Sequence, residues 1–239
     1  MQAELSLPPA VKVTHSQRAR RLALRLDPKE RVVNLVVPRG VSLKKAEDFA
    51  KFHETWIKKA MMELPPPMPF EHGRVIPVLG RDRLIQVYVD KTRLTTEIKL
   101  KVNKLEIYTN KADPSARIER FLKELAKEKI SELARAKAVH INKKIPRITI
   151  RDTKSRWGSC SEDGKLSFSW RLIFAPLKAM DYVIAHEVAH LVHLNHGKRF
   201  WTLCRELSRD FIEGEYWMRN HGHELMRYGQ KARRRTSLT

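Results

Sequence analysis

The chain has 239 residues and a formal net charge of +21 at pH 7, and 42% of its residues are hydrophobic. This length suffices for a hydrophobic core in one or two domains. No segment reaches the ~18 apolar residues of a membrane-spanning helix, the N-terminus lacks the pattern of a signal peptide, and two cysteines do not make a disulfide framework. We therefore expect a cytoplasmic globular protein without a membrane partner.

The excess of Lys and Arg bears on possible partners. It is spread along the chain and continues into a tail that contains Arg227, Lys231, Arg233, Arg234 and Arg235. Such a charge attracts polyanions, so nucleic acid is a candidate partner. A solvated basic surface explains the charge equally well, and neither a zinc finger nor an aromatic–basic repeat accompanies it.

The first half of the chain is predicted to be rich in β-strands. Alternating leucines at residues 22–26, a turn at 27–30 and a returning segment at 32–37 predict a β-hairpin. Ser42 is placed to cap a helix, and apolar residues at helical spacing extend that helix to about Leu64.

A run of prolines at residues 65–69 then interrupts the pattern, either as a domain linker or as a stiff connection inside one domain. Alternating apolar residues after it predict an antiparallel sheet with one solvent-exposed face. Its strands are expected at residues 75–79, 83–89, 97–102 and 104–108. Because no catalytic constellation occurs in this part, we assign residues 1–112 to a β-rich N-terminal domain.

The second half is predicted to form a catalytic domain at residues 113–239. Asp113 and Pro114 are typical of a helix start, and this helix should run to about Asn142 and pack against the helix that carries the motif below. A strand is expected at residues 165–173, with a free edge along the active-site cleft that is able to bind an extended peptide. The fold class is therefore α+β.

Residues 177–194 are predicted to form one buried helix that stops at Asn195. The helix contains the motif H-E-V-A-H at residues 186–190. Two histidines four residues apart lie one turn apart on the same face, so both imidazoles can bind one metal ion. Glu187 can then reach a metal-bound water without being a ligand, which is the role of a general base.

Spacing alone leaves alternatives for the third ligand. A catalytic zinc usually has three protein ligands and one open position. We favour His196, because the predicted stop lets the chain turn and approach the ion from another direction. His193 lies a further turn along the helix and is assigned to the wall of the site. Glu206 on a following helix stays the alternative ligand, and Cys160 is expected to be a packed thiol rather than a fourth ligand.

Three segments taken together resemble the YgjP-like metal-dependent hydrolases, which are related to the SprT-like and WLM metallopeptidases. They are K-S-R-W-G-S-C-S at residues 154–161, D-Y-V-I-A-H-E-V-A-H at residues 181–190 and N-H-G-K-R-F-W at residues 195–201. The arginine-rich stretch at residues 18–21, which leads into the predicted hairpin, also fits this family. The resemblance therefore extends over most of the chain.

The resemblance implies a zinc metallopeptidase with a zincin-like catalytic domain. It implies that His186, His190 and His196 bind Zn2+ and that Glu187 is the catalytic acid and base. The expected substrates are peptides or proteins. Two alternatives are a zinc hydrolase of nucleotides or other phosphorylated substrates and a DNA-associated, SprT-like protease. Residues predicted to contact the substrate or its oxyanion are Arg156, Trp157 and His193, with Tyr182, His221 and His223 as further candidates.

Overall fold

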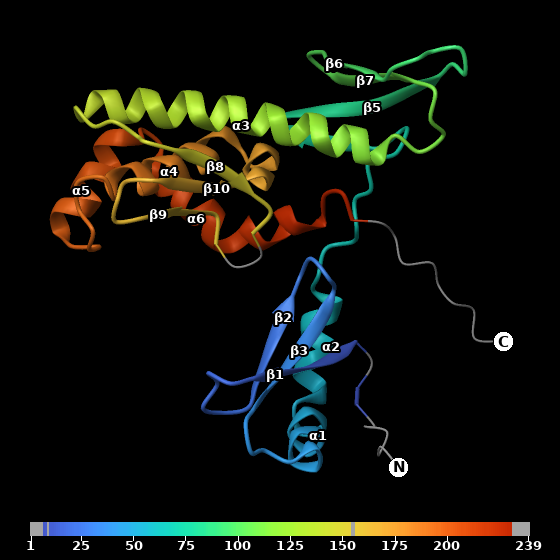
Figure 1. Ribbon diagram of the computed structural model, residues 1–239, viewed down its shortest axis with the longest axis vertical. Coiled ribbons are helices and arrows are strands. Elements are labelled where there is room, and N and C mark those ends of the chain that lie inside the picture. The colour runs from blue at the N-terminus through green and yellow to red at the C-terminus, as the bar shows by residue number, and fades with distance from the viewer. Residues whose placement is uncertain (1–6, 9, 154–155, 231–239) are drawn as a thin grey trace. The chain divides into compact units, whose positions relative to one another are not determined.

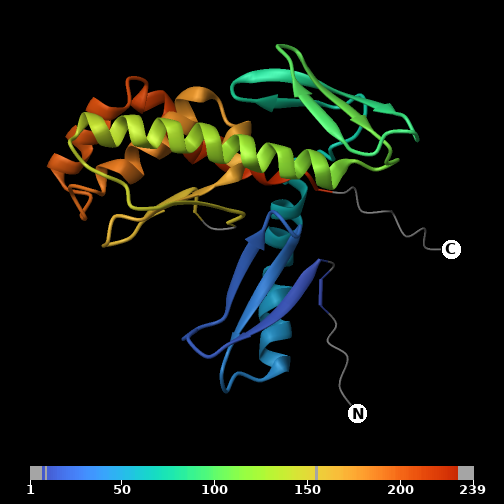
Figure 2. The ribbon, with the colours of Figure 1, turned by 45° about the horizontal axis from the view of Figure 1, so that its top comes forward.

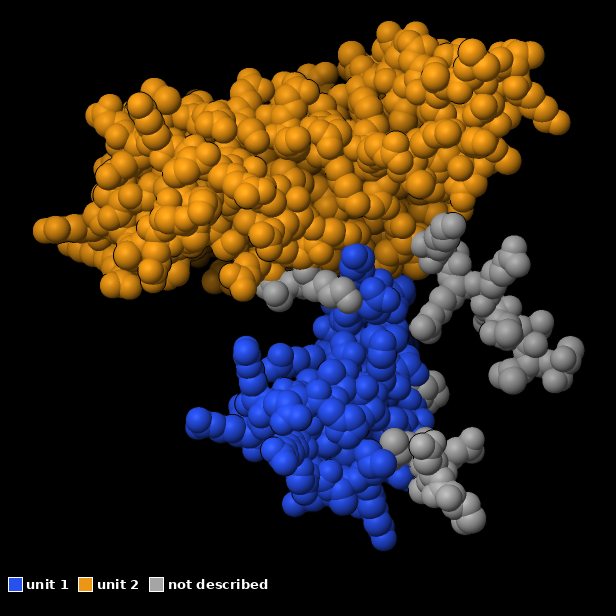
Figure 3. All heavy atoms as spheres, viewed as in Figure 1, with its two compact units in different colours: residues 1–66 blue, residues 67–239 orange. Residues whose placement is uncertain are grey.

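The computed structural model describes residues 7–8, 10–153 and 156–230, so the predicted basic tail from Lys231 onward and the Lys154-Ser155 pair lie outside the described residues. Contacts divide the chain into two compact units, residues 1–66 and residues 67–239 (Figure 3). The division falls in the proline-rich stretch, one of whose two interpretations from the sequence is a domain linker. The reason is that the strands after the prolines share one hydrophobic core with the later helices.

Unit 1 consists of a three-stranded sheet and two helices. The predicted hairpin is β2 (Ala23–Asp27) and β3 (Val32–Pro38), which pair antiparallel, and β1 (Val11–Ser16) pairs parallel to the other side of β3. The Asp27 carboxylate closes the turn by accepting the N–H groups of Lys29 and Glu30 at 3.1 and 3.0 Å. Asp27 therefore serves as the turn residue that the sequence indicates.

The predicted helix after Ser42 is interrupted near its middle. Helix α1 (Leu43–Phe52) begins at Ser42, whose hydroxyl accepts the N–H of Lys45, and α2 (Glu54–Met62) follows directly. His53 separates them with φ −96° and ψ 15°, outside helical values. Ala46 and Ala50 of α1 pack on the central strand β3 through Leu35 and Val37, which gives unit 1 its own small core.

Unit 2 begins with a four-stranded sheet in the order β4-β5-β7-β6. Its strands are β4 (Val75–Val78), β5 (Arg81–Val89), β6 (Glu97–Leu100) and β7 (Lys104–Thr109). All four strands occur where the sequence predicts them, but β5 and β7 pair parallel, so the sheet is mixed rather than antiparallel. Alternation of apolar residues reports which face is buried and not the direction of the neighbouring strand.

Helix α3 (Ser115–His140) is the longest element of unit 2. Figures 1 and 2 both show the four-stranded sheet beside its N-terminal part and the helices α4 and α5 beside its C-terminal part. The residues that α3 buries recur at every fourth position, so they line one face of the helix. They are Ile118, Leu122, Ala126, Ile130, Ala134 and Ala138. The expected packing of this helix on the motif helix is confirmed.

A second sheet precedes the motif helix, in the order β8-β10-β9. Its strands are β8 (Ile148–Arg151), β9 (Gly158–Cys160) and β10 (Leu166–Ser169). The expected strand at residues 165–173 ends at Ser169 and continues as the 3-10 helix η1 (Trp170–Phe174). Because β10 pairs with both neighbours, the edge strands of this sheet are β8 and β9 instead, and β9 is the one that contacts the motif helix.

The remaining helices complete unit 2. They are α4 (Leu177–Ala189), α5 (Lys198–Leu207), α6 (Phe211–His221) and the 3-10 helix η2 (Gly222–Arg227). Helix α4 is held on α3 by the ion pair between Lys137 and Asp181, whose charged atoms are 2.6 Å apart, and the same lysine donates to the carbonyl of Leu207 at the end of α5. Among the described residues, no helix has the length and apolarity needed to cross a bilayer.

Candidate metal centre

Helix α4 carries the H-E-V-A-H motif at its C-terminal end. Eight residues of the helix are buried, so it lies inside unit 2 as its apolar sequence predicts. His186 lies in the last helical turn and His190 is the residue that follows the helix. Their ring centroids are 5.1 Å apart, because a spacing of four residues places both side chains on one face.

The chain turns after α4 and brings a third imidazole to the same place. His186, His190 and His196 each offer one ring nitrogen, and these three atoms lie within 4.8 Å of one another. Phe200 at the start of α5 packs beneath all three rings, with its ring centroid 4.7 Å from that of His196. This buried phenylalanine therefore supports the turn from which His196 projects.

The spacing of the ring nitrogens fits a shared metal ion. The Nε2 atoms of His186 and His196 are 3.2 Å apart. Two nitrogen ligands at ~2.0–2.1 Å from a tetrahedral ion lie roughly 3.4 Å apart, which is close to this separation. Burial, and then the neighbouring His190 and His196, lower the pKa of His186 to about 4. His186 is therefore neutral at pH 7, which is the form that binds metal.

His190 is oriented by the turn that follows it. Its Nδ1 lies 3.0 Å from the backbone carbonyl oxygen of His193, so Nδ1–H donates and Nε2 keeps its lone pair for the cluster. The helix ends at Ala189, earlier than the predicted stop at Asn195, and this earlier end brings the carbonyl of His193 within reach. His193 is not a member of the cluster and contacts it through its backbone.

The rival ligands are not brought to the cluster. Among the described residues, the only group of three or more potential metal-binding side chains is formed by the three histidines, and it contains neither Glu206 nor Cys160. Glu206 is exposed on α5. Burial, and then the charge of Glu187, raise the pKa of Cys160 to about 11, as expected for a packed thiol outside the group of converging histidines.

Glu187 is buried beside the cluster without being one of its donors. Its exposed fraction is 7%, and it lies against β9 at Gly158. A Cβ atom added to Gly158 would be 2.5 Å from Glu187 Cγ and 2.6 Å from Oε1, so only glycine leaves room for this carboxyl group. Burial raises the pKa of Glu187 to about 7, although the charge of Arg156 acts in the opposite direction.

A hollow of about 390 Å³ opens beside Glu187. Two residues predicted to contact the substrate, Arg156 and Trp157, line it together with Tyr182. Sequence reasoning missed the contributions of α6, which are Glu215, Met218 and Arg219. Helix α6 reaches this place because it packs on α4, and no local spacing in the sequence reports that contact. The predicted candidates His193, His221 and His223 do not line this hollow.

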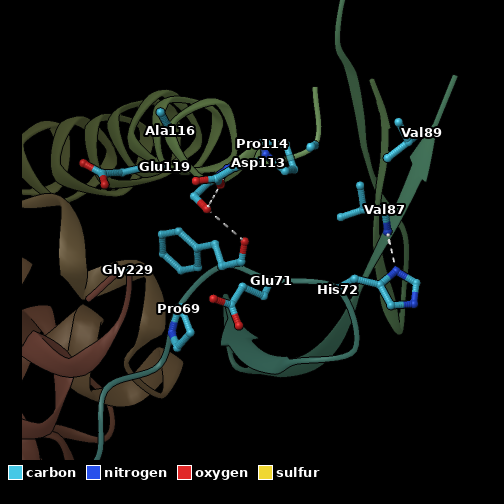
Figure 4. A pocket seen from close by; sticks show the side chains of 13 residues that line it. Pro69, Glu71, His72, Val87, Val89, Asp113, Pro114, Ala116, Glu119 and Gly229 are labelled. Atoms are coloured by element: carbon cyan, nitrogen blue, oxygen red, sulfur yellow. Dashed lines mark hydrogen bonds between the residues drawn. The ribbon is translucent and has the colours of Figure 1, made fainter. Parts of the chain in front are cut away.

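Other cavities of unit 2 are larger but do not touch the histidines. One of about 690 Å³ is lined by Phe70 and His72, by Asp113 just before α3 and by Glu119 in the first turns of α3 (Figure 4). Another of about 620 Å³ is lined by residues such as Trp217. Neither contains Glu187 or any of the three histidines. The candidate site is therefore located by its donor atoms rather than by cavity size.

Comparison with known proteins identifies a family. The family model of the YgjP-like, metallopeptidase domain matches residues 20–221. Among solved structures, the chain is similar to the metallopeptidase zymogen of Pyrococcus abyssi abylysin, with 19% identity and a TM-score of 0.35 over 39% of this chain and 95% of that chain. Comparison with the curated proteins gives no match. Because the family model covers most of the sequence, the chain belongs to the YgjP-like metallopeptidases and is a metal-dependent peptidase.

Proposed function

We propose that this metallopeptidase is a zinc enzyme that hydrolyses amide bonds of peptides or proteins. His186, His190 and His196 are the proposed ligands, and Glu187 is the proposed acid and base. One observation carries the proposal: three converging imidazoles lie next to a buried carboxyl group that is not one of the donors. Three ligands leave one coordination position open, as catalytic zinc sites require.

In the proposed mechanism the metal ion acts as a Lewis acid and Glu187 transfers protons. A bound zinc ion supplies a Lewis acid that polarises the scissile carbonyl and acidifies water. Glu187 takes a proton from the attacking water and delivers it to the leaving amine. A carboxyl group with a pKa of about 7 suits both steps, because it exchanges protons readily near neutral pH.

Side chains around the hollow supply candidates for holding the substrate. Arg156 and Tyr182 both line it beside Glu187, and each has a donor for a developing oxyanion. Burial raises the pKa of Tyr182 to about 12, so its phenol keeps its proton at neutral pH. Trp157 adds an apolar wall. The nearby edge strand β9 offers backbone groups for an extended peptide, which would then align with the motif helix.

The test combines metal analysis with proteolysis. Wild-type protein should contain about one zinc per chain and cleave members of a peptide library. Glu187→Gln should keep the zinc and lose activity by ~10²–10⁴-fold, because only proton transfer is removed. His196→Ala should lose the metal. Glu206→Gln, a charge-removing control on the neighbouring helix, should keep metal and activity. Loss of zinc in Glu206→Gln but not in His196→Ala would contradict the ligand assignment.

A second candidate function follows from the net charge of +21. We propose that a polyanion such as DNA binds the basic surface, in addition to proteolysis. The affinity should fall steeply with salt, because phosphate contacts release counterions. Fluorescence anisotropy with duplex DNA at two salt concentrations measures this. His186→Ala protein should bind DNA as wild type does, and salt-independent binding would contradict the proposal.

A further inference from the structure

We propose that the hollow beside Glu187 is a specificity pocket that binds a carboxylate of the substrate between Arg156 and Arg219. The inference rests on the proposed peptidase function and names the chemistry of the preferred substrate. It concerns Arg219 of α6 in particular, a residue that no motif singles out.

The hollow is placed to take a side chain of a peptide held at the metal centre. His186 and Glu187 form part of its wall, so a substrate whose scissile amide lies at Glu187 has a neighbouring residue next to the opening. Val183 and Met218 are buried and line it from α4 and α6. A volume of about 390 Å³ accommodates a long side chain, and these apolar residues suit its methylene groups.

Close packing of two helices positions the α6 part of the pocket. A Cβ atom added to Gly214 would lie 2.5 Å from the carbonyl oxygen of Lys178 and 2.6 Å from Tyr182 Cβ. Helix α6 therefore approaches α4 at a distance that only glycine permits. One turn later along α6, Met218 and Arg219 reach the hollow.

The charged groups of the pocket favour an anion. Arg156 and Arg219 are both exposed at the hollow, and neither forms an ion pair with another described residue. Glu215 is the one acidic side chain of the lining apart from Glu187. The pKa of Tyr182 is raised mainly by burial and next by the charge of Glu215, whereas the charge of Arg219 lowers it, which places both charges around one phenol.

A carboxylate satisfies this arrangement better than an ammonium group does. Two guanidinium groups line the hollow together with the carboxyl groups of Glu215 and Glu187, and burial keeps Glu187 partly protonated at pH 7 because its pKa is raised to about 7. Each guanidinium can bind a carboxylate through two parallel hydrogen bonds. A lysine side chain in the same hollow would meet two like charges. The glutamate side chain matches the pocket in length and in its apolar stem, and a C-terminal carboxylate of the substrate offers the same charged group.

The experiment measures binding and cleavage separately. Acetylated and amidated decapeptide libraries carry Glu, Gln or Lys at one fixed position, and fluorescence anisotropy gives their dissociation constants for zinc-loaded Glu187→Gln protein, which binds peptides without cleaving them. For one choice of the fixed position, peptides with Glu there should bind at least ~5-fold more tightly than peptides with Lys there. Arg219→Glu in the same background should reverse this preference, and Arg219→Gln should abolish most of it.

Arg209→Glu is the matched control, because it makes the same charge change at an exposed arginine outside the hollow. It should leave the preference unchanged. A second library with free C-termini distinguishes the two sources of carboxylate: tighter binding of these peptides whatever the side chain, lost in Arg219→Glu, identifies the terminal carboxylate.

The outcomes separate this inference from the proposed function. A Glu preference in binding that Arg219→Glu reverses supports the pocket even if wild-type protein cleaves no peptide, a result that would overturn only the peptidase proposal. Cleavage of the libraries by wild type with equal kcat/KM for Glu and Lys at every position overturns the pocket and leaves the peptidase. The pocket is also overturned if Arg209→Glu loses the preference for Glu over Lys to the same extent as Arg219→Glu does.

Discussion

Glu187 is subject to two opposing influences. Burial disfavours its ionised form and raises its pKa to about 7, while the nearby Arg156 favours the ionised form. The folded protein without metal therefore binds a proton at this carboxyl group more tightly than the unfolded chain does. Stability from this source is complete below the ordinary pKa of 4.5 and is lost as the pH rises through 7.

Replacement of this carboxyl group should therefore stabilise the metal-free protein at alkaline pH. Glu187→Gln removes the cost of ionisation, which corresponds to roughly 3 kcal/mol for a shift from 4.5 to about 7. Urea unfolding of chelator-treated protein should show the variant to be more stable than wild type at pH 8 and nearly equal to it at pH 5. Equal differences at both pH values would contradict the assignment of the shift to Glu187.

A substitution at Gly158 tests the position of the Glu187 carboxyl group without changing the carboxyl group itself. Because a Cβ atom at Gly158 would overlap the Glu187 side chain, Gly158→Ala should displace the carboxyl group and lower kcat/KM by about 10²-fold. The zinc content should not change, since the histidines are not displaced. Gly197→Ala is the control, because a Cβ atom there meets nothing within 4 Å. If Gly158→Ala kept the wild-type kcat/KM, the Glu187 carboxyl group would not depend on the space that Gly158 leaves.

For individual site residues, the sequence predicts contacts between residues that are close along the chain and not contacts between distant ones. The convergence of His186 and His190 follows from helical periodicity, and His196 was expected from a turn after the helix, although the helix ends at Ala189 and not at Asn195. The space that Gly158 leaves for Glu187 involves a strand and a helix far apart in sequence, so spacing gives no sign of it. Spacing likewise gives no sign that Arg219 lines the hollow, because that position depends on how α6 packs on α4.

Among the elements, the crossing of α4 and α6 determines the shape of the site. Gly214→Ala should destabilise unit 2 by ~1–3 kcal/mol, because the added methyl group overlaps the backbone of α4. Helix propensity alone would give the opposite sign, a gain of ~1 kcal/mol. Ile212→Ala on the same helix, where the side chain is 72% exposed, should change stability by less than ~0.5 kcal/mol. Chemical denaturation of the three proteins checks this, and a more stable Gly214→Ala protein would contradict it.

Element positions were predicted better than element partners. Every strand of the four-stranded sheet occurs near its predicted range, yet the parallel pairing of β5 with β7 was missed, as was that of β1 with β3. Hydrophobic alternation is a property of one strand, whereas pairing depends on the connections between strands. The break at His53 was missed for a related reason, since apolar spacing continues on both sides of it.

For the whole molecule, the assignment of a catalytic domain to residues 113–239 stays a proposal, and the core makes a specific prediction about it. Ile85, Leu105 and Ile107 of the four-stranded sheet are fully buried in the same core as Ile118 and Leu122 of α3. A fragment of residues 67–239 should therefore unfold cooperatively. A fragment of residues 113–239 lacks the sheet and should not.

Circular dichroism during thermal unfolding distinguishes the two fragments, with the full chain as the reference. The shorter fragment would expose the apolar face of α3 that the sheet covers, at a cost of ~25 cal/mol for each Å² of apolar surface. A cooperative transition in residues 113–239 alone would favour the boundary expected from the sequence. Loss of the transition in residues 67–239 would show that residues 1–66 are required for the fold.

The three proposed ligands have a further property in common, since they all lie between His186 and His196. In a denatured chain these rings stay tethered within a short loop, and closing a short loop costs little entropy. The denatured chain therefore retains part of the affinity for a transition-metal ion. Metal added to the protein must raise the unfolding free energy by less than the native dissociation constant alone predicts. A chain that refolds in the presence of metal starts with its imidazoles already gathered as a chelate.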